Sequence, residues 1–296
     1  MVAYSIAPVR ELLAPRGVIY SFISGDDQNI DPKTVQSFGE EWKSFHDFST
    51  EEIEKIGQDY FDLLPEKLIE SALDVGCGSG RWAKFLSPKL KWIEAIDPSE
   101  AVFAAQHLLS TQRNIRITQA SVSNIPFPDN SFDLVYSLGV LHHVPNTQDA
   151  ISQCFKKIRP KGYFLVYLYY NLDNRGILYF LLFKVANVIR ITISYFPTRI
   201  KKIVCNVIAA CIYWPLAKIS SMVAFFSLKL AQKIPLSYYR KTSFFVMRND
   251  ALDRFGTPLE KRFSKVEIET MLRQVGFINI NFSNREPFWH VIAQKP

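Results

Sequence analysis

The sequence predicts an α/β fold built on a mostly parallel β-sheet, and two observations support this. Short apolar runs alternate with longer amphipathic segments, the pattern of strands joined by crossover helices. The first run, 71–75, leads into a turn with glycine at every second position, Gly76, Gly78 and Gly80. Since ligands of parallel sheets bind at the carboxyl ends of the strands, this turn marks the expected site.

The expected sheet has seven strands, with the last one antiparallel. Strands are predicted at short apolar runs that end near turns, at 72–75, 92–96, 115–120, 132–137, 162–169, 278–282 and 288–293. Helices are predicted between them at 81–86, 99–109 and 147–158. A further helix follows Ser264, which forms a capping box with Glu267, and it ends at Gly276.

Residues 1–63 are predicted to form an N-terminal helical extension. Val35, Phe38 and Trp42 recur at steps of three and four, which places them on one face of a helix. A second helix begins near Ser49 with acidic residues in its first turn. Two interpretations of the apolar face fit: it packs on the core, or it closes over a ligand at the glycine turn.

Residues 171–249 are predicted to form a helical insertion, or lid, that follows the fifth strand. It interrupts a single core domain made of 64–170 and 250–296. From Asn174 to Asn249 the sequence has twelve Lys and Arg and no Asp or Glu, whereas the whole chain has 35 basic and 28 acidic residues. The basic character of the protein therefore belongs to one segment.

This basic segment fits more than one interpretation. Lys218, Lys229 and Lys233 lie on a narrow arc of a helical wheel that is otherwise mostly apolar, which fits a lid with solvated lysines or contact with an anionic lipid surface. The longest uncharged run, 203–217, is shorter than the ~20 residues of a membrane span and contains Pro215, so no conventional transmembrane helix is predicted. Nucleic-acid binding is not expected, because the aromatic residues form no stacking platform.

The cysteines and the amino terminus argue against other classes of protein. Cys77, Cys154, Cys205 and Cys211 form no C-x-x-C pair, so neither a metal site nor a redox dithiol is predicted. The amino terminus lacks a continuous apolar run, so no signal peptide is expected. A cytoplasmic protein is predicted, and the basic segment leaves membrane association open.

Three further features refine the expected site. Asp74 closes the first strand, so the turn reads D-x-G-x-G-x-G. Asp97 ends the second strand, near the ~20-residue offset at which an acidic residue meets a ribose. The block 124–144 reads N-I-P-F-P-D-N-S-F-D-L-V-Y-S-L-G-V-L-H-H-V. Together these residues resemble the class I S-adenosylmethionine-dependent methyltransferases, and within them the small-molecule group that includes quinone and natural-product methyltransferases. The resemblance is close over 64–170.

The resemblance implies a Rossmann-like fold and S-adenosylmethionine as cofactor. The implied cofactor-binding residues are Phe38, Trp42, Asp74, Gly76, Cys77, Gly78, Gly80, Asp97, Pro98, Ser121, Val122, Ser137 and Leu138. Ser121 departs from the family pattern, which has Asp there to hold the adenine amino group. A serine oxygen accepts the same hydrogen bond more weakly than a carboxylate does.

The resemblance also implies where methyl transfer takes place. His142 and His143 follow the fourth strand in the loop that lies beside the sulfonium in such enzymes, and one of them is a candidate general base. Stabilisation of the turn by both rings is the alternative. Asp173 is a candidate orienting carboxylate or an ordinary loop residue. Tyr167, Tyr169 and Tyr170 are candidates for the substrate pocket, where their rings could contact a sulfonium.

These features predict a methyltransferase that acts on a lipophilic or membrane-presented small molecule, with O-methylation favoured over C-methylation. Two alternatives fit the sequence. A sealed pocket would let the cofactor's own amine attack its carbon chain, which gives a cyclic amino acid and methylthioadenosine. A methyltransferase-like membrane adaptor without catalysis is the other, although the intact glycine turn and Asp97 argue against it.

Overall fold

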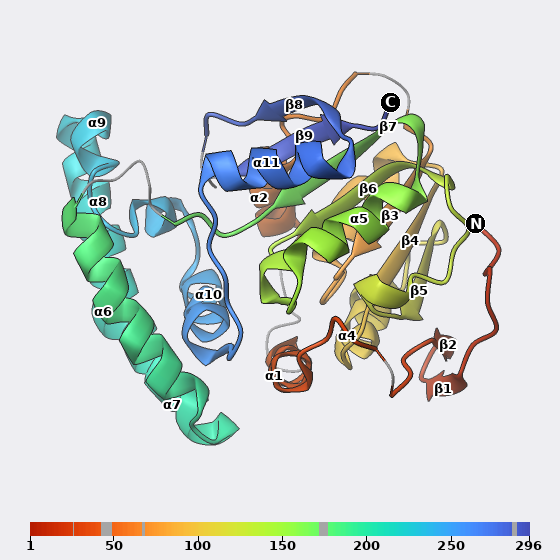
Figure 1. Ribbon diagram of the computed structural model, residues 1–296. Coiled ribbons are helices and arrows are strands. Elements are labelled where there is room, and N and C mark those ends of the chain that lie inside the picture. Colours follow the sequence, from red (N-terminus) through yellow and green to blue (C-terminus); the bar gives the residue numbers. More distant parts are fainter. Residues whose placement is uncertain (26, 43–48, 67–68, 172–176, 286–288) are drawn as a thin grey trace. The chain divides into compact units, whose positions relative to one another are not determined.

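The chain folds into two structural units (Figure 1). The computed structural model describes residues 1–25, 27–42, 49–66, 69–171, 177–285 and 289–296. The first unit comprises residues 1–174 and 259–296, and the second comprises residues 175–258. The expected boundary at 249/250 falls inside helix α10 (Phe244–Gly256). Because α10 continues from its N-cap Ser243 without a break, the second unit extends to Pro258.

A nine-stranded mixed sheet forms the first unit, in the order β1-β2-β5-β4-β3-β6-β7-β9-β8. The pairs from β2 to β7 are parallel, whereas β1–β2, β7–β9 and β9–β8 are antiparallel. The strands are β1 (Arg10–Ala14), β2 (Gly17–Ser21), β3 (Ser71–Val75), β4 (Trp92–Asp97), β5 (Ile115–Gln119), β6 (Phe132–Leu138), β7 (Ile158–Tyr167), β8 (Ile278–Phe282) and β9 (His290–Gln294). The α/β class and the antiparallel last strand are confirmed.

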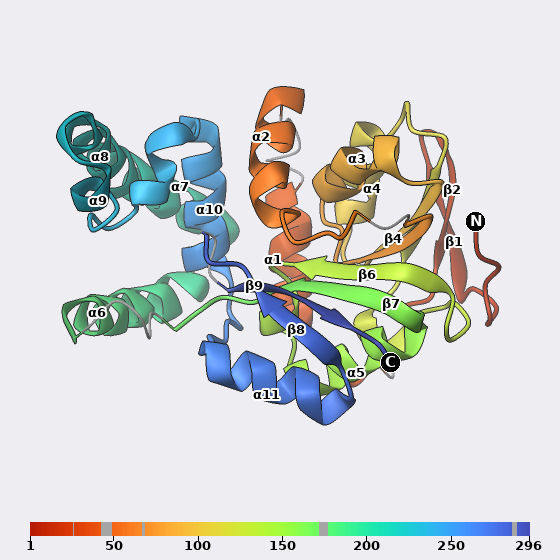
Figure 2. The ribbon, with the colours of Figure 1, turned by 90° about the horizontal axis from the view of Figure 1, so that it is seen from above.

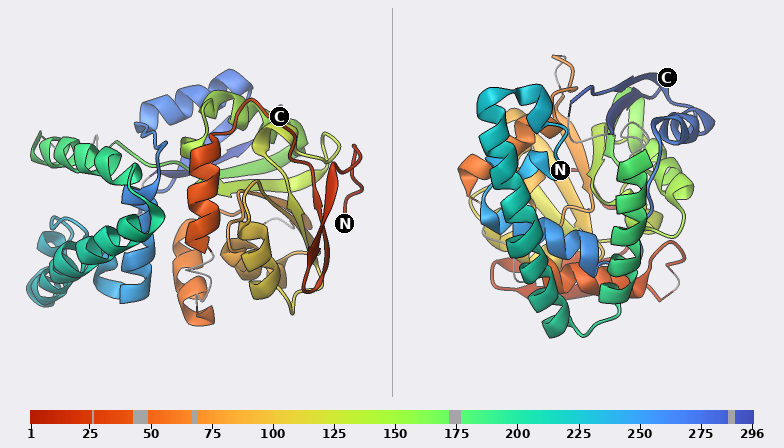
Figure 3. Two further views of the ribbon diagram at one scale, coloured as in Figure 1. Left: turned by 90° about the horizontal axis from the view of Figure 1, so that it is seen from below. Right: turned by 90° about the vertical axis from the view of Figure 1, so that its left-hand side faces the viewer.

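The expected number of seven strands is wrong, because an N-terminal hairpin adds β1 and β2 at one edge of the sheet (Figure 3). β2 joins the sheet through a single residue pair, Ser21 with Gln119. Much of the hairpin is solvent-exposed, and Leu13 is 87% exposed. Such strands lack the alternation of apolar and polar residues that identifies a half-buried strand in a sequence.

Helices cover both faces of the sheet. Figure 2 shows α3 (Arg81–Leu86) and α4 (Ala101–Leu108) on one side and α5 (Thr147–Lys157) and α11 (Lys265–Val275) on the other. The N-terminal helices α1 (Pro32–Trp42) and α2 (Thr50–Tyr60) contact α4 and α3, respectively. The capping box of Ser264 with Glu267 is confirmed, as is the left-handed Gly276 that ends α11.

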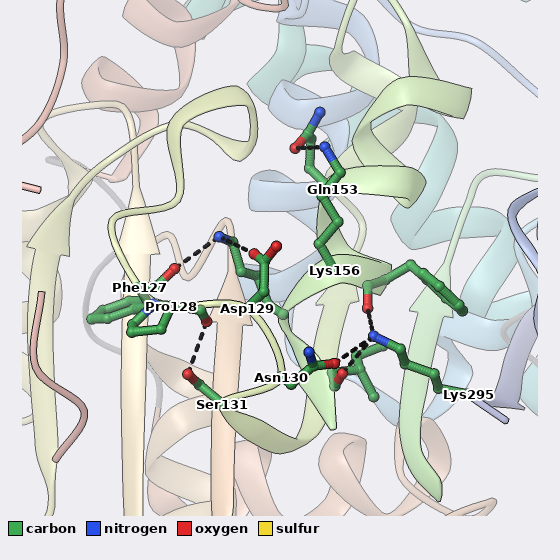
Figure 4. A network of polar contacts seen from close by, with 11 residues as sticks. Phe127, Pro128, Asp129, Asn130, Ser131, Gln153, Lys156 and Lys295 are labelled. Carbon is green, nitrogen blue, oxygen red and sulfur yellow. Dashed lines mark hydrogen bonds and ion pairs between the residues drawn. The ribbon is translucent and has the colours of Figure 1, made fainter. Parts of the chain in front are cut away.

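A polar network fixes the amino end of β6 (Figure 4). The Lys295 ammonium donates to the carbonyl oxygens of Phe155 and Ile158 and to the Asn130 side chain. The Lys157 ammonium donates to Asp129 at 2.8 Å. Since ligands of parallel sheets bind at the carboxyl ends of the strands, this network lies at the opposite end from the expected site.

The second unit is helical. Its elements are α6 (Ile177–Ser194), α7 (Thr198–Ile208), the π-helical η4 (Ala209–Tyr213), α8 (Trp214–Phe226), α9 (Leu228–Ala231), the 3₁₀-helix η5 (Ser237–Lys241) and α10. α10 packs against α6 and α7, and α8 packs against α9 and η5. Two of the basic residues have structural roles here: buried Lys201 donates to the Gly256 carbonyl, and buried Arg190 donates to that of Thr257. Cations at these carbonyls stabilise the carboxyl end of α10.

One helix of the second unit, Thr198–Phe226, is continuous through α7, η4 and α8. Its π-helical turn immediately precedes α8, whose first turn contains Pro215, and a proline nitrogen cannot donate a hydrogen bond. Among the described residues it is the one helix long and apolar enough to cross a membrane, judged by length and composition only. The core helix of a soluble protein passes the same test, although only 28% of the apolar window here is buried. The sequence-based expectation considered only the shorter uncharged run inside this helix.

Candidate functional site

The glycine turn after β3 has the backbone conformation that its sequence suggests. Gly76, Gly78 and Gly80 have φ angles of 81°, 51° and 83°. A Cβ on Gly76 would lie 2.4 Å from a methyl group of Val140, and one on Gly80 would lie 2.7 Å from Leu109. These two positions therefore exclude larger side chains on both conformational and steric grounds.

Asp97 holds this turn in place. Its carboxylate accepts hydrogen bonds from the Gly78 amide at 2.9 Å and from the Ser99 amide and hydroxyl at 2.9 and 2.6 Å. Burial raises the pKa of Asp97, and the hydrogen bonds from Ser99 and Gly78 oppose the shift. The amides of Gly76 and Cys77 donate to the carbonyl oxygen of Ile96, so β4 determines the shape of the turn.

Asp74 lies in β3, two residues before the first glycine of the turn. Its side chain is buried, and within the described part of the chain its Oδ2 accepts no hydrogen bond. Burial raises the pKa of Asp74 to about 8, assisted by the negative charge of Asp97 and opposed by the nearby Tyr136 hydroxyl. The carboxyl is therefore largely protonated at neutral pH. Burial also raises the pKa of the neighbouring Cys77 thiol, which makes this thiol a poor nucleophile.

A pocket opens beside the turn at the carboxyl ends of β3, β4 and β5. Among the expected cofactor-binding residues, Gly76, Pro98 and Val122 line it. Further lining residues come from the N-terminal segment, the three strands and the loop after β6, namely Asn29, Ile30, Asp31, Val35, Val75, Ile96, Ala120, Val140, Leu141, His143 and Val144. The walls are mostly apolar with a few polar groups, which is the usual composition of a small-molecule site.

The two adjacent histidines have different environments. His143 lines the pocket, and its Nδ1 lies 2.6 Å from the carbonyl oxygen of Leu259. Because a carbonyl only accepts, Nδ1 carries the proton and Nε2 of the neutral ring carries the lone pair. His142 is fully buried, does not line the pocket, and stacks on Tyr169 at 3.9 Å. Burial, with smaller contributions from His143 and Arg262, lowers the pKa of His142 well below its usual range.

The remaining expected residues form two groups. Phe38 on α1 makes an edge-on contact with the His143 ring at 4.9 Å, so it joins the site from the N-terminal extension. Tyr167 and Tyr169 contact each other at the end of β7, and Tyr170 pairs with Phe263 in an isolated bridge. Neither group lines this pocket. In the second group, buried Ser137 donates to the Val75 carbonyl, and Leu138 is buried beside it.

Two expected residues cannot be placed. Asp173 lies outside the described residues, and so does the side chain of Trp42, although its backbone ends α1. Within the described ranges, no three His, Cys, Asp or Glu side chains come together in a group that could hold a metal ion.

The segment that carries the turn, Asp97 and the histidine loop matches a known family. Residues 73–166 match the family model described as a methyltransferase domain. This segment is a class I S-adenosylmethionine-dependent methyltransferase domain. The resemblance based on the glycine turn and on 124–144 is thereby confirmed, and with it S-adenosylmethionine as the cofactor of the domain.

This chain aligns with only part of the length of its curated relatives. A probable S-adenosylmethionine-dependent methyltransferase of Mycolicibacterium smegmatis is 31% identical over 94 residues, which are 32% of this chain and 36% of the relative. A ubiquinone biosynthesis O-methyltransferase of Dechloromonas aromatica is 29% identical over 147 residues, 45% of this chain and 61% of the relative. The chain thus spans less than two thirds of either. The solved structure of human N-acetylserotonin methyltransferase with its cofactor is 16% identical, with a TM-score of 0.49 over 87% of this chain and 56% of that one.

The residues of the pocket fit the cofactor. Gly76 lines the pocket, and the apolar side chains of Ile96 and Val122 suit a flat base. The sequence reasoning did not identify Asn29 and Asp31. They precede the turn by more than forty positions and belong to no motif of the domain. Only the fold reveals that this segment borders the pocket.

Proposed function

We propose that the protein is a methyltransferase that transfers the methyl group of S-adenosylmethionine to a hydroxyl of a lipophilic small molecule. The observation that carries the proposal is a single pocket in which Gly76 and Pro98 meet His143. The cofactor supplies an electrophilic methyl group on a sulfonium. Gly76 lines this pocket, Asp97 holds the turn, and Val122 and Pro98 form apolar walls.

His143 is the proposed general base. Its Nδ1 proton is held by the Leu259 carbonyl, so Nε2 is the atom that takes the proton from the acceptor hydroxyl as the new C–O bond forms. His142 has a structural role in this proposal, because its buried, neutral ring packs between Tyr169 and His143. Phe38 supports the His143 ring from α1.

The surface of the second unit supports the proposal that the acceptor is lipophilic. Phe225, Phe226 and Met222 on α8 are 88%, 86% and 70% exposed. The surrounding segment from 174 to 249 carries twelve basic and no acidic residues. An exposed apolar surface with Lys and Arg beside it suits the surface of an anionic membrane, from which a lipophilic acceptor would be taken.

The function is tested by incubating the purified full chain with S-adenosylmethionine, alone and with lipid or aqueous cell extracts. Mass spectrometry follows every product of the cofactor. We expect S-adenosylhomocysteine only when the lipid extract is present. Its formation with the aqueous extract alone would contradict a lipophilic acceptor. Methylthioadenosine formed from protein and cofactor alone would replace methyl transfer by intramolecular cyclisation.

The role of His143 has its own test. His143→Gln should lower kcat about 10²–10⁴-fold while the affinity for S-adenosylhomocysteine, measured by calorimetry, changes little. His107→Gln is the matched control, because His107 is solvent-exposed on α4. Equal activity of the two variants would rule out His143 as the base.

A further inference from the structure

The N-terminal segment after β2 brings a carboxylate to the position where the sequence lacks one. The Asp27 carboxylate accepts a hydrogen bond from the Ser123 hydroxyl at 3.4 Å, and the Ser123 and Ser121 hydroxyls are 2.9 Å apart. Ser121 is the residue at which the methyltransferase pattern has Asp, and its neighbours Ala120 and Val122 line the pocket. Asp27 and Ser121 therefore lie within one hydrogen-bonded cluster at the border of the pocket.

The fold holds this segment at both ends. On one side, the Phe22 amide donates to the Gln119 carbonyl at the end of β5, and the Asn124 side chain donates to the Phe22 carbonyl. On the other side, the Asn29 side chain donates to the Asn146 carbonyl at 2.8 Å and accepts from the Asn146 amide at 2.6 Å. Contacts of Phe22 and Asn29 thus hold Asp27 near the end of β5 and the Ser121 turn, and they do not involve the Asp27 side chain.

One oxygen of this carboxylate has no protein partner. Oδ1 accepts from Ser123, whereas Oδ2 is buried and forms no hydrogen bond with any residue that the structure describes. A buried acceptor without a donor is unfavourable, so a donor that arrives with a ligand binds strongly there. An exocyclic amino group of a base has N–H groups to donate, and its neighbouring ring surface suits the apolar residues Pro98 and Val122.

We infer that Asp27 is the acceptor for the adenine amino group and takes the place that Ser121 leaves without a carboxylate. This inference rests on the proposed function, because it assigns a residue within the same cofactor site. In it, Ser121 and Ser123 orient the carboxylate through Oδ1, and Oδ2 selects a base that donates at this position. The specificity for adenine then comes from a segment about fifty residues before the glycine turn.

The test compares two ligands by calorimetry on the full chain: S-adenosylhomocysteine, and its deaminated form S-inosylhomocysteine, which has a carbonyl oxygen in place of the amino group. The wild type should prefer the adenosyl ligand by about 10-fold or more, because the carbonyl oxygen of S-inosylhomocysteine and the Asp27 carboxylate are both acceptors. Asp27→Asn should lower affinity for the adenosyl ligand about 10–100-fold and remove the preference, because an amide can donate to the carbonyl.

Three further variants identify the acceptor. Ser121→Ala should keep the preference, whereas its loss there would assign the acceptor to Ser121 instead. Ser121→Asp in the Asp27→Asn background should restore the preference. Asp129→Asn removes the same charge in the network of Figure 4, away from the pocket, and should leave both affinities unchanged.

The outcomes separate this inference from the proposed function. A wild type that binds neither ligand would overturn the proposed function. A wild type that binds the adenosyl ligand but shows no preference, or an Asp27→Asn variant that weakens both ligands equally, would overturn the assignment of Asp27 alone. The ratio of affinities is the decisive quantity, because a purely structural role of Asp27 would not change it.

Discussion

The core of the first unit and helix α8 of the second unit place large apolar side chains in opposite environments. In the first unit Phe127, Phe132 and Phe164 are fully buried, because the sheet has two faces that helices cover. In the second unit the buried positions of α8 are the small residues Ala217 and Ser220, and large residues point outward. Small residues let helices approach closely, as they do in membrane proteins. A segment rich in apolar residues therefore does not always bury its large side chains in a core.

The largest effect expected from this difference is on stability. Phe164→Ala should lower the free energy of unfolding by about 3–5 kcal/mol, because it removes a ring that stacks on Phe277 inside the core. Phe226→Ala should change it by less than about 0.5 kcal/mol, since that ring is 86% exposed. Denaturant titration followed by circular dichroism measures both. Similar losses in the two variants would mean that the second unit buries its apolar surface as the first one does.

The fold of the first unit follows largely from its sequence. β3 to β9 and the helices between them are identifiable because each strand is a short run of apolar or alternating residues that ends near a turn. The hairpin β1–β2 was missed, because its strands lack this alternation and Pro15 lies between them. Local patterns predict elements that bury one face and miss those that attach to a sheet edge through few contacts.

The candidate site was predictable in part. Gly76, Pro98, Val122 and His143 lie in one motif-bearing segment, and the pocket brings them together. The contribution of Asn29 was not predictable, because its place depends on hydrogen bonds with Asn146, far along the chain. The choice between His142 and His143 also required the structure, because the two residues are adjacent and the conformation of the loop after β6 determines which ring lines the pocket.

The next largest effect concerns Asp74, a buried carboxyl of the first unit. Its pKa is about 8 in the folded protein and about 3.9 in an unfolded chain, so the folded state binds the proton more tightly. This stabilisation is complete below about pH 4 and is lost as the pH rises through about 8. Asp74→Asn is neutral at every pH, so its stability should fall less than that of the wild type between pH 5 and 8. The difference is at most about 1.4 kcal/mol per pH unit.

Thermal unfolding of both proteins across this range measures the effect. Asp129→Asn is the control, because its carboxylate is exposed in an ion pair with Lys157, and it should follow the wild type. Parallel curves for the wild type and Asp74→Asn would show that Asp74 is ionised in the folded protein.

The smallest expected effect concerns the binding of the second unit to anionic lipid vesicles. Lys229 is exposed on α9, within the segment that lacks acidic residues. Lys229→Gln should weaken binding to phosphatidylserine-containing vesicles about five-fold, since one lysine near an anionic surface contributes about 1 kcal/mol. Sedimentation with vesicles measures the binding, and vesicles of phosphatidylcholine alone should show no difference. Lys91→Gln makes the same change in charge on the first unit, where Lys91 pairs with Glu70, and should leave binding unchanged. If both variants weakened binding equally, the attraction would come from the net charge of the whole chain rather than from the apolar, basic surface of the second unit.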